Sequence, residues 1–255
     1  MKLYICENYQ NAKWTKNISD KKKLSLAFVK KCICDFLDEK ENNIDIVISK
    51  NEYGKPYVES IYKIISKNKN DTGYDTEKIK IDISLFFSLS HSADMIICAV
   101  ACFNIGVDCQ KRNIENIENC KKIAKRFYTE QENDFLNSIL GQDNLEKSEE
   151  TEENEENFEE TVKEESYINN FFRIWTKKEA YIKYTGKGLA EGMQTFSVAS
   201  KTKQKSYHGE VYFKRISLAN LKKIKKISKN EKFKYNIYLC YNKDNKNNWQ
   251  IKYFY

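Results

Sequence analysis

Two neighbouring apolar stretches constrain the fold of this chain most strongly, because both predict strands of a buried sheet. In residues 83–90, Ile83, Leu85, Phe87 and Leu89 alternate with mostly serine positions, a pattern that predicts a strand with one wetter face. Residues 95–103 are apolar throughout, which fits a strand buried on both faces and is too short for a membrane-spanning helix. Residues 105–108 follow a turn at position 104, so we expect these three segments to form an antiparallel meander.

Helical spacing of apolar residues predicts helices over residues 24–37, 117–127 and 171–184, with Gly186 ending the last one. Residues 45–49, 211–213, 235–240 and 249–255 have the composition of strands. Gly54 and Pro56 bracket a lysine and predict a turn over residues 51–58, and the polar residues 68–77 predict a loop. Helices and strands of this kind indicate an α+β protein.

Charge is distributed unevenly along the chain. Residues 144–165 hold eleven Glu against two Lys, so we predict an acidic, disordered surface insertion over about 141–167. Because the whole chain carries +7, the remainder carries about +16, which favours acidic partners or phosphorylated ligands. Lysines scattered over a solvated surface would produce the same charge.

Cysteine usage and hydropathy indicate a cytosolic, reduced protein. None of the eight cysteines forms a C-x-x-C pair and only two histidines are present, so neither a zinc site nor a disulfide framework is expected. The first residues lack the apolar region of a signal peptide, and no apolar run is long enough to cross a membrane.

Two acidic residues and a lysine are the candidates for chemistry. Asp108 follows an apolar strand, and Glu179 and Lys183 lie one helical turn apart, just before a Gly-Lys-Gly loop whose backbone can approach a phosphate. Each feature has an ordinary explanation, a turn-forming Asp and a surface ion pair. Together, the two carboxylates could hold Mg²⁺ beside a phosphate ester.

Five motifs follow one another along about 150 residues, from Lys50 to Val198. They are Tyr53-Gly54-Lys55-Pro56, Leu89-Ser90-His91-Ser92, Gly106-Val107-Asp108-Cys109-Gln110, the segment Arg126 to Glu132, and Trp175 through Leu189. In these motifs, their order and their spacing, the chain resembles the 4'-phosphopantetheinyl transferases of the surfactin-synthetase-activating type.

The resemblance implies roles for the acidic motif residues and for Lys183. Asp108 and Glu179 would bind the metal, Glu179 would also be the general base, and Lys183 would neutralise the pyrophosphate and assist the leaving group. Gln110 stands where the family has a second carboxylate, so it would be a neutral metal ligand at best and could weaken metal binding.

It also implies contacts with coenzyme A. Lys55, Ser90 and His91 correspond to positions that contact its 3'-phosphate and adenosine, and Lys187 could reach a phosphate. His91 could instead be a satisfied core histidine, and Lys187 could simply be exposed to solvent.

The implied fold is α+β with two similar halves, residues 1–103 and 104–255, each a small antiparallel sheet with a covering helix, related by a pseudo-twofold axis. The implied reaction is the Mg²⁺-dependent transfer of 4'-phosphopantetheine from coenzyme A to a serine of an apo acyl or peptidyl carrier protein. We expect a monomer with no nucleic-acid or membrane partner. Two alternatives stay open: a basic nucleic-acid-binding protein without activity, and a degenerate relative that binds coenzyme A without turnover.

Overall fold

The computed structural model describes residues 1–12, 15, 20–69, 73–112, 116–141, 153–199, 204–206, 209–218, 235–242 and 249–254. Its helices are α1 (Lys21–Leu37), α2 (Ile117–Phe127), α3 (Glu130–Leu140) and α4 (Glu153–Thr185). Its strands are β1 (Lys2–Glu7), β2 (Ile44–Lys50), β3 (Pro56–Lys69), β4 (Gly73–Lys80), β5 (Phe86–Ser92), β6 (Met95–Ala101), β7 (Ile105–Lys111), β8 (Gln204–Ser206), β9 (Gly209–Arg215), β10 (Tyr235–Asn242) and β11 (Gln250–Phe254).

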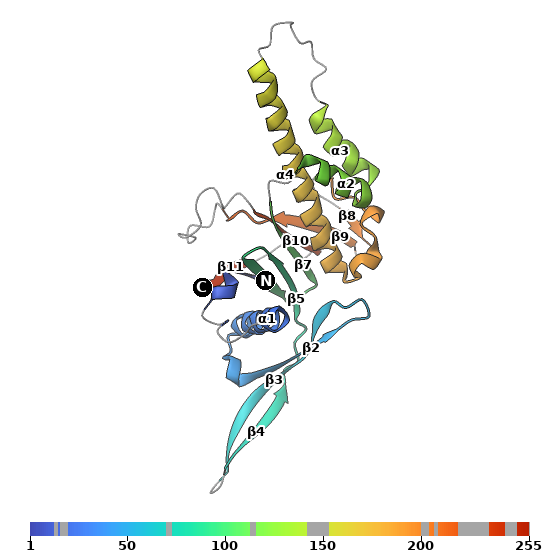
Figure 1. Cartoon of the computed structure of the whole chain (residues 1–255). Helices are drawn as coiled ribbons and strands as arrows, with labels where there is room; N and C mark the ends of the chain where they lie inside the picture. The colour runs from blue at the N-terminus through green and yellow to red at the C-terminus, as the bar shows by residue number, and fades with distance from the viewer. Residues whose placement is uncertain are drawn as a thin grey trace.

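Two four-stranded sheets are packed face to face between helices. The first has the order β11-β1-β6-β5 and the second β7-β10-β9-β8. Helix α1 covers the outer face of the first sheet, and α4 covers the outer face of the second (Figure 1). The helix–sheet–sheet–helix arrangement encloses one apolar core under α1 and another between the sheets.

The alternation of side chains along the strands explains why β6 is apolar throughout. Ile96, Cys98 and Val100 face α1, whereas the intervening Ile97 and Ala99 pack against the second sheet. Both faces of β6 are therefore buried, as a strand in the middle of a layered fold requires.

Serine side chains join the two sheets where the edge strands β5 and β7 meet. The hydroxyl groups of Ser88, Ser90 and Ser92 accept hydrogen bonds from the backbone N–H groups of Val107 (2.9 Å), Cys109 (3.2 Å) and Lys111 (2.9 Å), respectively. The expected wetter face of this strand was therefore wrong, because Ser88 and Ser90 are buried. Their polarity supplies acceptors for backbone N–H groups that the sheets leave unpaired.

The expected meander is correct for its first two strands and wrong for the third. β5 and β6 form an antiparallel pair, but β7 leaves them to pair with β10. The expected loop over residues 68–77 was also wrong: β3 extends to Lys69 and β4 starts at Gly73, forming a hairpin that projects from the body (Figure 1).

Three strands of each four-stranded sheet have the same chain order. In the first, β1 is followed by α1, by a separate three-stranded sheet of order β2-β3-β4 and then by the β5–β6 hairpin, and β6 lies between β1 and β5. In the second, β7 is followed by α2 to α4 and then by the β9–β10 pair, and β10 lies between β7 and β9. The ladders joining these three strands in each sheet are antiparallel, and β11 adds a parallel edge strand beside β1.

Helix α4 begins much earlier than predicted. We expected disorder over about 141–167, but the structure is helical from Glu153 onward, and residues 142–152 lie outside the described residues. The physical reason is tertiary packing: α3 lies alongside α4, and the buried Tyr167 joins the core between them (Figure 1). Glutamate is also a good helix former and is favourable near a helix N-terminus.

The predicted helices over 24–37 and 117–127 and the strands of the C-terminal third are confirmed, whereas β1 was not predicted. All eight cysteines are free. Within the described ranges, we find no helix with the length and hydropathy needed to cross a bilayer.

Candidate active site

Asp108 is the centre of a buried polar cluster between β5, β7 and α4. Its side chain, only 2% exposed, accepts hydrogen bonds from the hydroxyl of Ser90 and the ammonium of Lys183, both at 2.7 Å. Gln110 donates its amide N–H to the other carboxylate oxygen at 3.1 Å. Asp108 therefore lies where the first sheet, the second sheet and α4 meet, and it is ion-paired with Lys183.

A glycine allows α4 to approach β7 this closely. A Cβ atom on Gly106 would lie 2.0 Å from the carbonyl oxygen of Ala180 and 2.6 Å from the amide nitrogen of Tyr184. Both are backbone atoms of α4, so no side-chain rotation could relieve the overlap. The close approach brings Lys183 within ion-pair distance of Asp108.

The structure gives Lys183 a different partner from the one that helical spacing suggests. The ordinary expectation was an ion pair between Glu179 and Lys183 on the helix surface, but the ammonium pairs with Asp108. Burial raises the pKa of Glu179, and the nearby charge of Asp108 raises it further, whereas Lys183 lowers it. The two predicted metal-binding carboxylates thus influence each other electrostatically.

The donor set fits a hard divalent cation. Two carboxylates, Asp108 and Glu179, repel each other in a partly buried site, and a divalent cation would relieve this repulsion. Gln110 can add an amide oxygen if its terminal amide group flips, so that the oxygen and the nitrogen exchange places. Among the described residues, no three His, Cys, Asp or Glu side chains converge, so this site relies on two carboxylates.

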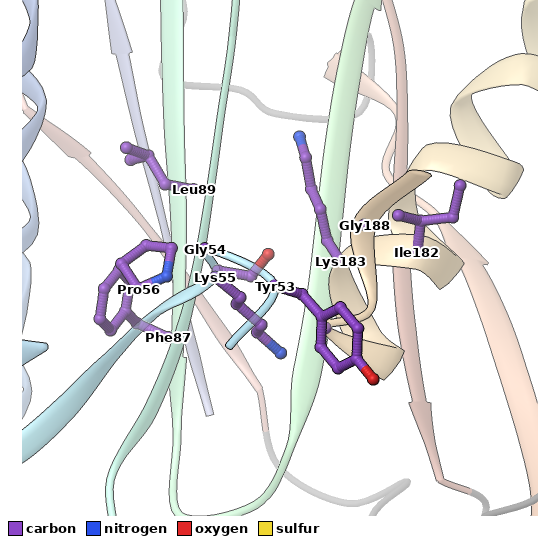
Figure 2. A pocket seen from close by; sticks show the side chains of 11 residues that line it. Tyr53, Gly54, Lys55, Pro56, Phe87, Leu89, Ile182, Lys183 and Gly188 are labelled. Carbon is purple, nitrogen blue, oxygen red and sulfur yellow. The ribbon is translucent and has the colours of Figure 1, made fainter. Parts of the chain in front are cut away.

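A pocket of about 330 Å³ opens next to Lys183 (Figure 2). It lies between the turn before β3, strand β5 and the C-terminal end of α4. Its lining is mostly apolar, with two lysines, and consists of Tyr53, Gly54, Lys55, Pro56, Phe87, Ser88, Leu89, Ile182, Lys183, Gly186 and Gly188. Lys183 is shared between the pocket and the Asp108 cluster, so a ligand in the pocket lies beside the carboxylates.

Lys55 holds the turn before β3 against the end of α4. Its ammonium donates to the carbonyl oxygen of Tyr184 (3.2 Å) and to the side-chain oxygen of Asn104 (3.3 Å). Asn51 shapes the same turn by accepting from the Lys55 N–H (2.8 Å), and its amide donates to the carbonyl oxygen of Gly186 (3.0 Å). Carbonyl groups that α4 leaves without intrahelical partners are thereby satisfied by residues of the N-terminal region.

The remaining predicted residues lie at different distances from the pocket. Ser90 is buried and contacts Asp108, and it is not part of the pocket lining. His91 is exposed on β5, two residues beyond the pocket residue Leu89 and so on the same face of the strand. Lys187 is part-exposed, 4.0 Å from Glu191. The structure thus brings together Asp108, Gln110, Glu179 and Lys183, with Lys55 across the pocket.

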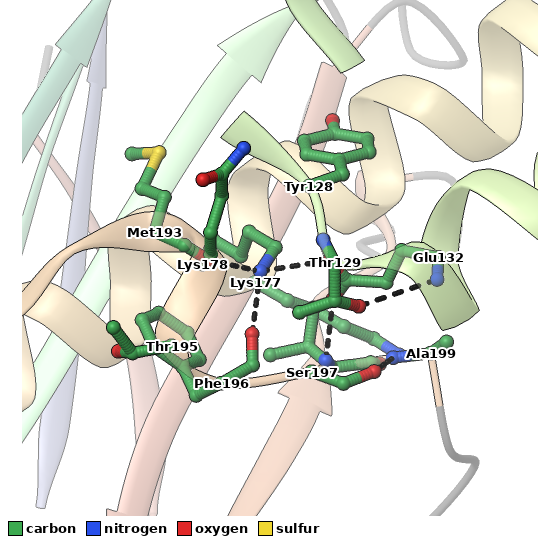
Figure 3. A network of polar contacts seen from close by, with 12 residues as sticks. Tyr128, Thr129, Glu132, Lys177, Lys178, Met193, Thr195, Phe196, Ser197 and Ala199 are labelled. Carbon is green, nitrogen blue, oxygen red and sulfur yellow. Dashed lines mark hydrogen bonds and ion pairs between the residues drawn. The ribbon is translucent and has the colours of Figure 1, made fainter. Parts of the chain in front are cut away.

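A buried ion pair, which the sequence patterns did not predict, anchors the C-terminal third of α4 (Figure 3). Lys178 lies 2.8 Å from Glu132 of α3, and neither side chain is exposed. Lys178 also donates to the carbonyl oxygens of Met193 and Phe196, both at 2.6 Å, and Glu132 accepts from the Val198 N–H at 2.6 Å. The pair therefore connects α3, α4 and the loop after α4. Glu132 also forms the capping box at the start of α3 with Thr129.

Three curated proteins to which the chain is similar are all 4'-phosphopantetheinyl transferases. The chain is 27% identical to the 4'-phosphopantetheinyl transferase gsp of Aneurinibacillus migulanus over 154 residues, 60% of this chain and 44% of that protein. It is 29% identical to the 4'-phosphopantetheinyl transferase Sfp of Bacillus subtilis over 154 residues, 60% of this chain and 47% of that protein. The 4'-phosphopantetheinyl transferase psf-1 of Bacillus pumilus is 33% identical over 114 residues, 45% of this chain and 37% of that protein.

The chain spans somewhat less than half the length of these curated relatives. A family model described as the 4'-phosphopantetheinyl transferase superfamily matches residues 104–240, which is more than half of the chain. The matched region contains Asp108, Glu179 and Lys183, which converge in the structure. The chain therefore belongs to the 4'-phosphopantetheinyl transferase superfamily.

Proposed function

We propose that this protein transfers the 4'-phosphopantetheine group of coenzyme A to a serine of an apo acyl or peptidyl carrier protein. The observation that carries the proposal is the contact between the buried Asp108 and the partly exposed Lys183, next to Glu179 and at the wall of a pocket. Membership in the superfamily supports the same reaction.

The proposed step is a displacement at phosphorus. The serine oxygen of the carrier forms a bond to the β-phosphate of coenzyme A, and the bond between the two phosphates breaks. The electron pair of that bond leaves with 3',5'-ADP, and the serine proton passes to Glu179. Burial raises the pKa of Glu179, which makes its carboxylate a better proton acceptor. Positioning and charge neutralisation provide most of the catalysis in such transfers.

Asp108 and Glu179 are the proposed holders of Mg²⁺, with Gln110 as a neutral neighbour. A bound Mg²⁺ would neutralise the pyrophosphate charge and orient the β-phosphate. Asp108 would then no longer need the Lys183 ammonium as its counter-charge, and Lys183 could bind the pyrophosphate instead.

We infer that the two sheets with their covering helices are the two similar halves of the family, related by a pseudo-twofold axis. Their shared chain topology supports this relation. Coenzyme A would then lie where the halves meet, in the pocket with Lys55 and Lys183, and the adjoining His91 and Lys187 would extend the contact surface. The excess positive charge outside the acidic segment suits a monomer that docks an acidic carrier.

The test is incubation with coenzyme A, Mg²⁺ and an apo carrier protein, followed by intact mass spectrometry of the carrier. We expect the carrier to gain the mass of one phosphopantetheine group. Glu179→Gln should slow the reaction by about 10²–10⁴-fold, the usual contribution of a general base. The exposed Glu130→Gln on α3 is the matched control and should retain activity. A native protein that leaves every apo carrier unmodified, with or without added metal, would refute the proposal.

Gln110 provides a second, independent test. Restoring the carboxylate in Gln110→Glu should lower the Mg²⁺ concentration needed for half-maximal activity, because a charged ligand binds a hard cation more tightly. An inactive native protein with an active Gln110→Glu variant would instead identify a relative that binds coenzyme A without turnover. Unchanged Mg²⁺ dependence in the variant would show that residue 110 does not face the metal.

A further inference from the structure

Asn236 lies near the start of β10, next to the candidate active site. Strand pairing puts it directly opposite Gln110 of β7, and puts the neighbouring Tyr238 opposite Asp108. Residues opposite each other in antiparallel strands point to the same face of a sheet, so Asn236, Gln110 and Asp108 share the face that α4 covers. The Cβ atoms of such an opposite pair lie about 4.5–5.5 Å apart, so the amide groups of Asn236 and Gln110 can reach each other.

Asn236 has a buried hydrogen-bond donor without a partner. Its side chain is 2% exposed, and its amide nitrogen finds no acceptor among the described residues. An unpaired buried N–H costs the full penalty of its removal from water, so such groups are rare in folded proteins. The acceptor that the strand register offers to Asn236 is the side-chain oxygen of Gln110.

Gln110 is turned toward Asp108 instead. Its amide N–H donates to one oxygen of the Asp108 carboxylate at 3.1 Å. The other carboxylate oxygen accepts from both Ser90 and Lys183, each at 2.7 Å, so the oxygen facing Gln110 is the less crowded one. A divalent cation bound there would lie beside the positive end of the Gln110 N–H dipole. Because the cation and the N–H repel each other, they compete for this oxygen.

We propose that Asn236 is a positioning residue of the metal site, which holds the Gln110 amide away from Asp108 when Asp108 binds a divalent cation. In that arrangement the Asn236 N–H donates to the side-chain oxygen of Gln110, and Gln110 presents this oxygen to Asn236 rather than to the cation. The new hydrogen bond offsets the one that Asp108 gives up, so the cation binds more tightly. This inference rests on the proposed function, since it takes Asp108 as a metal ligand.

Mn²⁺ binding to the full-length protein, measured by electron paramagnetic resonance without coenzyme A, tests the proposal independently of turnover. Mn²⁺ prefers the same octahedral oxygen ligands as Mg²⁺. We expect Asn236→Leu to weaken Mn²⁺ binding by about tenfold. Its melting temperature without added metal should equal or exceed that of the native protein, because an unpaired buried donor has been removed. Asn242→Leu, at the end of β10, is the matched control and should keep the native affinity.

A double-mutant cycle tests whether Asn236 acts through Gln110. Gln110→Met removes the acceptor, so adding Asn236→Leu to this variant should not change the Mn²⁺ affinity further. An equal loss of affinity in both backgrounds would overturn the proposal, because Asn236 would then act on the site without Gln110. Native affinity in Asn236→Leu alone would overturn it as well.

A nuclear magnetic resonance experiment on the native protein gives an answer even if Asn236→Leu fails to fold. Adding Mg²⁺ should move the side-chain N–H signal of Asn236 downfield, because this group gains an acceptor. The signal of Gln110 should move upfield, because its N–H leaves a carboxylate. An Asn236 signal that stays in place while Mg²⁺ saturates the protein would contradict the inference.

The proposed function and this inference fail in different ways. A protein that shows the expected Mn²⁺ cycle but modifies no carrier refutes the transferase reaction and supports the role of Asn236. A native protein that binds neither Mn²⁺ nor Mg²⁺ refutes the metal site and the inference together.

Discussion

Ser90 shows how a single hydroxyl can serve both the fold and the site. It accepts the N–H of Cys109, which joins the sheets, and it donates to Asp108 at 2.7 Å. The resemblance assigned Ser90 to coenzyme A, and that assignment stays a prediction. Its observed contact with Asp108 supports a positioning role, in which it orients a carboxylate that we propose as a metal ligand.

Ser90→Ala separates these two roles. If Ser90 positions Asp108, the variant should need about 10–100 times more Mg²⁺ for half-maximal activity, the usual cost of losing a group that orients a metal ligand, with little change in the KM for coenzyme A. Ser92→Ala is the matched control, because it removes a neighbouring link to β7 that does not touch Asp108. A raised KM for coenzyme A with unchanged Mg²⁺ dependence would favour the direct contact instead.

At the scale of elements, the approach of α4 to β7 depends on Gly106. Because its missing Cβ would overlap two backbone atoms of α4, Gly106→Ala must push the helix away from the strand. We expect a loss of about 3 kcal/mol in the free energy of unfolding, measured by urea denaturation. Gly141→Ala is the control, since a Cβ there would meet only ordinary contact at 3.7 Å. Equal stability of the two variants would contradict the close packing.

At the scale of the whole molecule, Lys55 connects the N-terminal region to the end of α4 across the pocket. Burial lowers its pKa from 10.5 to about 8. Above pH 10.5 the amine is neutral in both the folded and the unfolded chain, whereas below about pH 8 the folded chain must hold a buried charge. The native protein therefore gains stability as the pH rises from about 8 to 10.5, because the unfolded chain binds more protons there.

Lys55→Met should remove this gain. The difference in unfolding free energy between native and variant protein, measured by urea denaturation, should rise in favour of the native protein over that pH range. Groups that titrate in both proteins cancel in the difference. Lys125→Met, an exposed lysine on α2, should leave the pH dependence unchanged. A difference that stays flat with pH would show that Lys55 is not charged and buried at neutral pH.

Local patterns predicted most of the elements, since they depend only on spacing along the chain. The spacing of apolar residues predicted α1, the alternation of apolar residues and serines predicted β5, and the motif around Glu179 predicted the C-terminal part of α4. Errors arose where an element depends on its neighbours. The start of α4 is acidic and was expected to be disordered, but it is helical and continuous with Tyr167, which packs in the core with α3. The serines of β5 indicated solvent, but they lie against β7.

The sequence by itself determined which apolar residues of α1 and β6 face the core, because side-chain periodicity is a local property of helix and strand. It also indicated Asp108, Glu179 and Lys183 as candidates, through the family motifs. Only the tertiary structure decided that Lys183 pairs with Asp108 rather than Glu179, and that Ser90 of the first sheet contacts Asp108 of the second. The reason is that such contacts join residues far apart in the chain, and the packing of whole layers, not any local pattern, sets the distances between them.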